Sequence, residues 1–132
     1  GYGESDTQNV FSNATLDIAT DLSVGAGGLT LASETTDVAS VSSTEIASFV
    51  AADFVGAKLT ICASEGTNRH ICELLVTHNG TTAVSTQYGS VLTNSTLATY
   101  DVTLSTGVVR VFAVGASATS TTYKVAKQLL PA

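Results

Sequence analysis

Hydrophobic and polar residues alternate along most of the chain with a period of two. The stretch VGAKLTICAS places Val55, Ala57, Leu59, Ile61 and Ala63 on one side and Lys, Thr, Cys and Ser on the other. This alternation is typical of a β-strand with one buried face, whereas an amphipathic helix repeats about every 3.6 residues. Helical periodicity is nearly absent, so the pattern predicts an all-β protein.

The alternation recurs in short segments that Gly, Asn, Ser and Thr separate at intervals of roughly 8–12 residues. Leu16 and Ile18 share one face of their segment, and so do Tyr123 and Val125. Strands are expected at residues 10–20, 22–31, 38–49, 55–64, 69–78, 81–92, 97–104, 108–114 and 121–129. Short strands at this spacing indicate an antiparallel β-sandwich of jelly-roll or immunoglobulin-like type.

One domain is expected over residues 11–132, preceded by an extended N-terminal arm at residues 1–10 (GYGESDTQNV). The arm is polar, so we expect it to become ordered only against a neighbouring surface. The glycine-rich stretch at 25–28 resembles a phosphate-binding loop only weakly. No Lys or helical pattern follows it, which favours a simple turn.

Asn79-Gly80 is the strongest hairpin signal in the chain, because both residues tolerate the positive φ of a two-residue turn. Such a turn places His78 opposite Thr81 and Leu75 opposite Val84. Residues 55–92 are then expected to form a three-stranded meander, with Asn79 and Gly80 setting its register.

A second tight turn is expected at residues 65–69 (EGTNR). If its loop has three residues, Cys62 lies opposite Cys72 and the pair is placed for a cross-strand disulfide. The favoured alternative is two free thiols packed as small hydrophobic side chains.

The strand expected at 69–78 has apolar residues on both faces, with Ile71 and Leu75 on one and Leu74 and Val76 on the other. A two-layer sandwich covers only one face, so a partner chain or the folded-back arm would cover the second. This predicts a homo-oligomer, with a trimer favoured.

The residues that could hold a metal are His70, His78, Cys62 and Cys72. A zinc site needs about four ligands at one point, and two histidines eight residues apart on a strand are too distant to share an ion. Neither a catalytic carboxylate pair nor a nucleophile motif is apparent. We therefore expect no metal, no cofactor and no catalytic residue.

Two carboxylates have candidate ionic partners. Glu73 lies among apolar neighbours, and either Arg69 or Arg110 is a candidate partner, with simple exposure as the alternative. Asp101 and Arg110 lie on adjoining predicted strands and are candidates for a cross-strand ion pair.

Charge excludes one class of partner and hydropathy another. The formal net charge is −6, and the five Lys and Arg residues form no cluster. Nucleic-acid binding requires clustered basic residues, so it is excluded. No apolar run is long enough to cross a bilayer, so a membrane partner is not expected.

Residues 45–130 carry a family resemblance. The runs ELLVTHNGTTAVSTQYGSV and LATYDVTLSTGVVRV, with the closing YKV, resemble virion structural proteins of tailed bacteriophages, particularly phages of cyanobacteria. The resemblance implies a non-enzymatic particle component, located on the virion after assembly in the bacterial cytoplasm.

The favoured function is a capsid decoration or cement protein that contacts copies of itself and the major capsid protein or another virion protein. The alternative is a tail-fibre or tail-adaptor domain that binds a receptor or carbohydrate. The absence of Trp disfavours carbohydrate binding. A third class, a polysaccharide-degrading spike fragment, would need the carboxylate pair that is not apparent.

Overall fold

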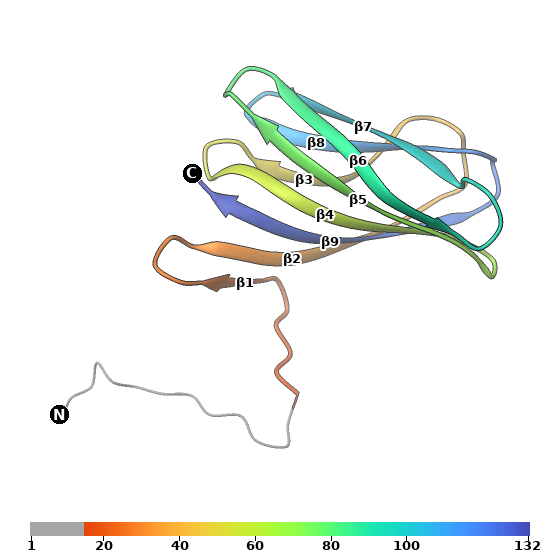
Figure 1. The fold of residues 1–132 in the computed structure, drawn as a ribbon, viewed down its shortest axis with the longest axis horizontal. Helices are drawn as coiled ribbons and strands as arrows, with labels where there is room; N and C mark the ends of the chain where they lie inside the picture. The colour runs from red at the N-terminus through yellow and green to blue at the C-terminus, as the bar shows by residue number, and fades with distance from the viewer. Residues whose placement is uncertain (1–14) are drawn as a thin grey trace.

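The computed structural model describes residues 15–132, and nine β-strands run through them (Figure 1). They are β1 (Asp21–Val24), β2 (Leu29–Val38), β3 (Thr44–Val50), β4 (Phe54–Glu65), β5 (Asn68–His78), β6 (Ala83–Leu92), β7 (Ala98–Ser105), β8 (Val108–Gly115) and β9 (Thr121–Pro131). Among these residues no helix is long and apolar enough to cross a membrane.

The strands form two antiparallel sheets of unequal size. The large sheet has six strands in the order β1-β2-β9-β4-β5-β6, and the small sheet has three in the order β3-β8-β7. The chain leaves the large sheet after β2 and after β6, and returns to it at β4 and at β9. The predicted antiparallel β-sandwich is confirmed.

The core lies between the sheets. Leu59 and Ile61 of the large sheet and Val109 and Val111 of the small sheet have no exposed surface, and Val125 of β9 is 1% exposed. The inward face predicted for residues 57–63 is therefore confirmed, as is the inward placement of Val125.

Val55 is an exception to the predicted face, because it is 45% exposed. The pairing of β4 with β9 shifts between Phe54 and Gly56, which turns Val55 outward. Gly56 allows this bulge to lie against β5, since a Cβ there would be 2.6 Å from the carbonyl oxygen of Val76.

The strands predicted before residue 50 are placed incorrectly. The segment 22–31 is a hairpin, because Gly25 and Gly28 adopt φ of +80° and +79° and the Gly28 N–H donates to the Gly25 carbonyl. The segment 38–49 contains the end of β2, a connection and then β3. Residues 15–20 form no strand, and the predicted residues 10–14 and arm 1–10 lie outside the described residues.

The β4-β5-β6 meander is confirmed, but the predicted register at Asn79 is wrong by two residues. His78 pairs with Ala83 and Leu75 with Thr86, so the loop has four residues. The Asn79 side chain explains the longer loop, because its Oδ1 accepts hydrogen bonds from the N–H groups of Thr81 and Thr82. The shift is an even number, so side chains as far as the Glu73–Tyr88 pair keep their predicted faces, whereas the irregularity beyond it brings Val91 opposite Ile71.

The turn between β4 and β5 is shorter than predicted, and this overturns the disulfide geometry. Glu65 pairs with Asn68, which makes a two-residue loop and places Cys62 opposite Ile71. The single-residue shift puts the two cysteines on opposite faces of the sheet. Both are free thiols in the structure, with Cys72 buried in the core.

A polar clamp joins the two sheets where β2 and β9 lie over β3. Lys127 Nζ donates to Glu34 Oε2 at 2.7 Å and to the Ser48 carbonyl at 3.0 Å. The Ser48 N–H donates to the same carboxylate oxygen at 3.1 Å. Side chains of the large sheet thus satisfy backbone groups at the free edge of β3, where another strand would otherwise pair.

Lys127→Met should lower the free energy of unfolding by roughly 1–3 kcal/mol, because it leaves the Glu34 carboxylate and the Ser48 carbonyl without their charged donor. Lys124→Met is the matched control, since Lys124 is exposed on the outer face of the same strand. It should change stability by about 0.5 kcal/mol or less. Urea denaturation measures both, and equal losses would contradict the role of the clamp.

Candidate functional site: the outer face of the six-stranded sheet

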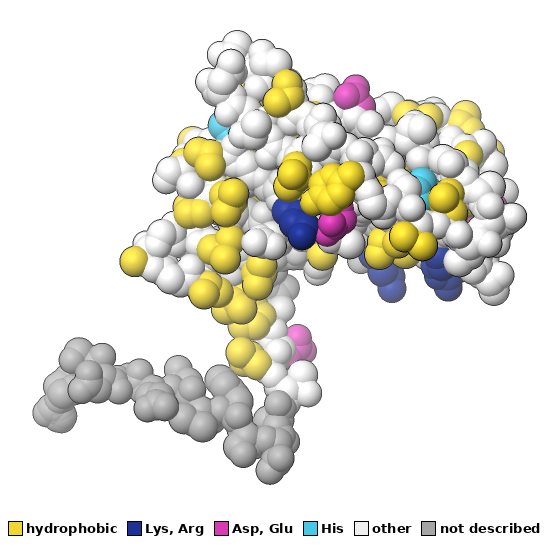
Figure 2. Space-filling model, viewed as in Figure 1, with side chains coloured by type: hydrophobic (Ala, Val, Ile, Leu, Met, Phe, Trp, Pro, Cys, Tyr) yellow, Lys and Arg dark blue, Asp and Glu magenta, His cyan; other side chains and the backbone are white. Residues whose placement is uncertain are grey.

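The outer face of the large sheet carries many exposed apolar side chains. Figure 2 shows hydrophobic side chains gathered over β2, β9 and β4. Each of the larger ones is 38–64% exposed: Leu22, Leu31, Val55, Ile71, Leu75, Val84, Tyr88, Val91 and Leu130. No other segment within residues 15–132 covers this face, although the sequence predicted that both faces of β5 would be covered.

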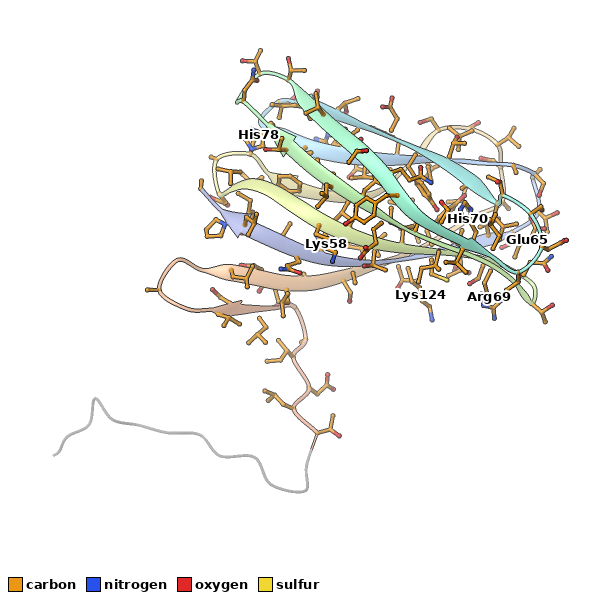
Figure 3. The ribbon with its side chains drawn as sticks, in the orientation of Figure 1. Lys58, Glu65, Arg69, His70, His78 and Lys124 are labelled. Atoms are coloured by element: carbon orange, nitrogen blue, oxygen red, sulfur yellow. The ribbon has the colours of Figure 1, made fainter. Side chains whose placement is uncertain are left out.

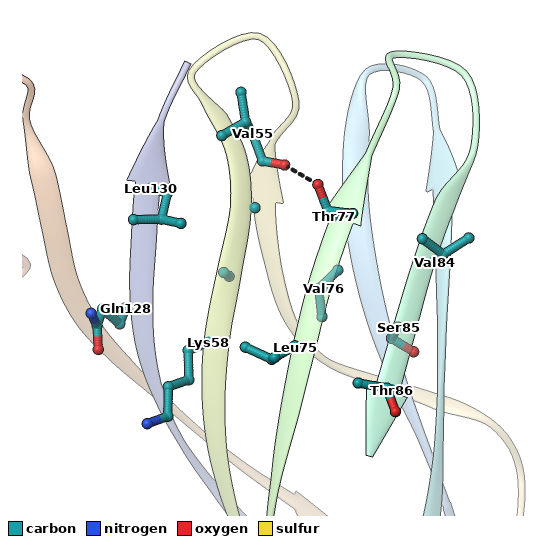
Figure 4. A pocket seen from close by; sticks show the side chains of 12 residues that line it. Val55, Lys58, Leu75, Val76, Thr77, Val84, Ser85, Thr86, Gln128 and Leu130 are labelled. Carbon is teal, nitrogen blue, oxygen red and sulfur yellow. Dashed lines mark hydrogen bonds between the residues drawn. The ribbon is translucent and has the colours of Figure 1, made fainter. Parts of the chain in front are cut away.

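A pocket of about 530 Å³ opens on this face across β9, β4, β5 and β6 (Figure 4). Its apolar lining comes chiefly from Val55, Leu75, Val84 and Leu130. The bulge in β4 contributes to this shape, because it points Val55 outward beside Leu130. The result is a concave apolar surface open to solvent, which is the form of a binding site.

A polar cluster lies beside the pocket. Lys58 Nζ is 3.3 Å from Glu73 Oε2, and the Thr60 hydroxyl donates to the same oxygen at 3.3 Å. Tyr88 pairs with Glu73 across the β5–β6 register and is 38% exposed. The ion pair is open to solvent, so it contributes little stability and its groups remain available to a ligand.

The candidate ion pairs predicted from the sequence are wrong. Glu73 pairs with Lys58, and Arg110 donates to Glu45 Oε1 at 2.9 Å. Asp101 lies opposite Phe112 in the β7–β8 register, so it is not placed beside Arg110. Arg110 pairs with Thr103, so it lies two residues along β8 from the position opposite Asp101.

β6 forms one edge of the large sheet, and its pairing with β5 is irregular between Ile71 and Glu73, beside Gly89 with φ of +67°. Its sequence, AVSTQYGSVL, contains no charged residue and no proline. By contrast, β1 has only four residues and begins with Asp21, β3 is closed by the polar clamp, and β7 carries Asp101. Edge strands normally carry such features because a bare edge recruits other strands.

The two histidines lie near opposite ends of β5 and do not form one site (Figure 3). His70 is 2% exposed, and its Nδ1 accepts a hydrogen bond from the Leu97 N–H at 3.3 Å. Its Nε2 is buried without a hydrogen-bond partner. Burial lowers the pKa of His70, because the charged ring would lose its hydration.

His78 is the last residue of β5, and both of its ring nitrogens make hydrogen bonds. The Gly80 N–H donates to Nδ1 at 3.0 Å, and Nε2 contacts the Phe54 carbonyl at 2.7 Å. Gly80 has φ of +89°, as its turn predicted. The sequence predicted the turn but not these hydrogen bonds, because the bond to Phe54 requires the start of β4 to lie beside the end of β5.

The remaining metal candidates also lie apart. Cys62 is on the outer face and Cys72 is in the core, where burial first and the charge of Glu73 second raise the pKa of the thiol. Within the described residues no three His, Cys, Asp or Glu side chains gather as a metal site would require.

No family model matches the chain, and no curated protein matches it. Solved structures with a similar fold include the tailspike protein of Acinetobacter phage vB_ApiP_P1, at a TM-score of 0.56 and 22% identity over 94% of this chain. Another is the tailspike protein gp49 of Acinetobacter baumannii bacteriophage Fri1, a capsular polysaccharide depolymerase, at a TM-score of 0.50 and 15% identity over 86%. The chain spans 26% and 21% of the lengths of these two proteins.

Identities at this level establish a shared fold alone. They nevertheless correct the expectation that the protein is not an enzyme, because one neighbour with this fold is described as a depolymerase. The lack of a carboxylate pair in this chain therefore does not exclude an enzyme. Both neighbours are tailspikes of Acinetobacter phages, and neither supports capsid decoration or a cyanobacterial phage.

The buried His70 should make stability fall as the pH drops. Its pKa is lowered in the folded chain, so below about pH 6.5 the unfolded chain binds a proton that the folded chain does not. His70→Asn keeps an acceptor for the Leu97 N–H but cannot be protonated. The variant should lose less stability than the wild type between about pH 7 and pH 5 in urea denaturation. Parallel curves for the two proteins would contradict a role for His70.

Proposed function

We propose that the chain is a domain of a phage tail protein of the tailspike type, carried on the virion, which assembles with copies of itself. The observation that carries the proposal is the apolar outer face of the large sheet, bordered by the uncharged edge strand β6. Exposed apolar patches of this extent mark sites of protein contact. The fold likeness to two tailspike proteins supports the tail as the location.

The size of this face fits a stable interface. Strands about 4.8 Å apart and about ten residues long give a six-stranded sheet roughly 800 Å² on one face. A standard interface buries about the same area on each partner. Leu75, Val84 and Leu130 around the pocket would supply the apolar centre of the contact.

A ring of copies is the favoured assembly. In a heterologous contact the outer face of one chain packs on a different surface of the next, and such contacts close into rings when the rotation permits. A trimer is the smallest ring that a heterologous contact can close, so it remains the favoured state.

Polysaccharide binding is a second candidate function of the same face. The observation that favours it is the cluster of Tyr88, Lys58 and Glu73, because an aromatic ring beside charged donors and acceptors suits a sugar. Gln128 extends the polar side of the pocket. In this case the ring of Tyr88 would stack on a sugar of the host capsule.

Leu75→Glu should shift the protein from oligomer to monomer, because it places a charge at the centre of the proposed interface. Val114→Glu is the matched control: Val114 is 39% exposed on β8 of the small sheet. Sedimentation equilibrium should show an association constant at least roughly 100-fold lower for Leu75→Glu and unchanged for Val114→Glu. A monomeric wild type, or equal effects of both variants, would refute assembly through this face.

Tyr88→Ala should weaken retention on immobilised capsular polysaccharide by roughly tenfold, through loss of the stacking surface. Val91→Ala, on the same strand, should leave it unchanged. Unchanged retention for Tyr88→Ala, or no retention of the wild type on any of a panel of purified capsular polysaccharides, would remove this second candidate and leave the assembly proposal to its own test.

A further inference from the structure

The loop between β5 and β6 places an Asn-Gly pair against a histidine base. The Gly80 N–H donates to His78 Nδ1 at 3.0 Å, so this nitrogen carries a free lone pair. The other ring nitrogen must then hold the proton, which it donates to the Phe54 carbonyl at 2.7 Å. The second bond orients the ring, so that Nδ1 faces the Gly80 N–H.

The side-chain carbonyl of Asn79 is also held by donors. Its Oδ1 accepts from the Thr81 N–H at 3.0 Å and from the Thr82 N–H at 2.8 Å. Two backbone N–H groups on one carbonyl oxygen stabilise the negative charge that develops there when a nucleophile attacks the carbon. The loop therefore combines a nucleophile, a base and a polarised carbonyl within four residues.

We propose that Asn79 is a self-modification site, at which the Gly80 nitrogen attacks the Asn79 side chain with His78 as general base. Nδ1 of His78 takes the Gly80 amide proton, and the Gly80 nitrogen bonds to Cγ of Asn79. The bond from Cγ to the side-chain nitrogen then breaks, and ammonia leaves with the proton returned by His78. Water opens the resulting succinimide at either carbonyl, which yields aspartate or isoaspartate.

The surroundings of Gly80 permit this reaction. A Cβ at Gly80 would have no heavy atom within 4 Å, and residues 79–82 are all exposed. The missing side chain leaves the nitrogen open, and solvent reaches the ring that must be hydrolysed. The His78 ring is held in place from its other side by Phe49, at 6.3 Å between ring centroids.

Modification would alter one end of the outer face. Each product adds a negative charge to a chain whose formal net charge is −6. Isoaspartate also lengthens the backbone beside the His78–Ala83 pair, so it would disturb the start of the β5–β6 register. The adjacent residues Thr77 and Val84 line the apolar pocket, which links the modification to that surface. The chemistry itself does not depend on the proposed function.

The test is to incubate the full chain at neutral pH in water enriched in heavy oxygen and to map its peptides by mass. Asn79 should incorporate the label as aspartate and isoaspartate. Asn94 and Asn68, which precede Ser95 and Arg69, serve as internal controls and should react at least about tenfold more slowly, because no histidine precedes them and a side chain hinders the attacking nitrogen.

His78→Phe removes the base but keeps an aromatic ring against Phe49, and it should slow the reaction at Asn79 at least about tenfold. Thr77→Val is the matched control, because it removes a different bond between the same strands, from the Thr77 hydroxyl to the Val55 carbonyl. It should leave the rate unchanged. A rate at Asn79 no faster than at Asn94, or a rate in His78→Phe that equals or exceeds the wild type, would overturn the proposal.

Discussion

The contact among Lys127, Glu34 and Ser48 determines how the two sheets can meet. It is the point where side chains of the large sheet satisfy the N–H and carbonyl groups of β3. Apolar packing alone has no preferred direction, so it would bury the small sheet in several offsets. Glu34 and Lys127 together bond the N–H and the carbonyl of Ser48, and a different offset would leave these groups without their partners.

The unequal size of the sheets leaves the large sheet with more apolar surface than the small sheet can cover. Three strands can pack against only one face of the six-stranded sheet, and the opposite face keeps Ile71, Leu75 and their neighbours in solvent. β5 carries apolar side chains on both faces, and only the face toward the small sheet is buried. Contact with a partner would remove the other face from water. The β6 edge lies beside it, so one contact could satisfy both features.

The sequence predicts the strands well wherever side chains alternate against the core, as in residues 57–63, because period-two burial is a local property. It fails where a few loop atoms decide the outcome. The Asn79 side chain lengthens one loop and the two-residue Gly66-Thr67 loop shortens another, and the second change separates Cys62 from Cys72. The outer-face pocket and the polar clamp were not predicted, because each requires strands that are distant in the sequence to become neighbours.

The β5–β6 loop shows how register and chemistry depend on each other. A two-residue turn at Asn79-Gly80 would have closed directly on a His78–Thr81 pair. In the four-residue loop the Asn79 carbonyl binds two N–H groups, and the Gly80 N–H turns to His78. The arrangement that fixes the register is thus the same arrangement that activates the amide. A change that relieved the reactive geometry, such as loss of the Asn79 carbonyl, would also remove the bonds that hold the loop at this length.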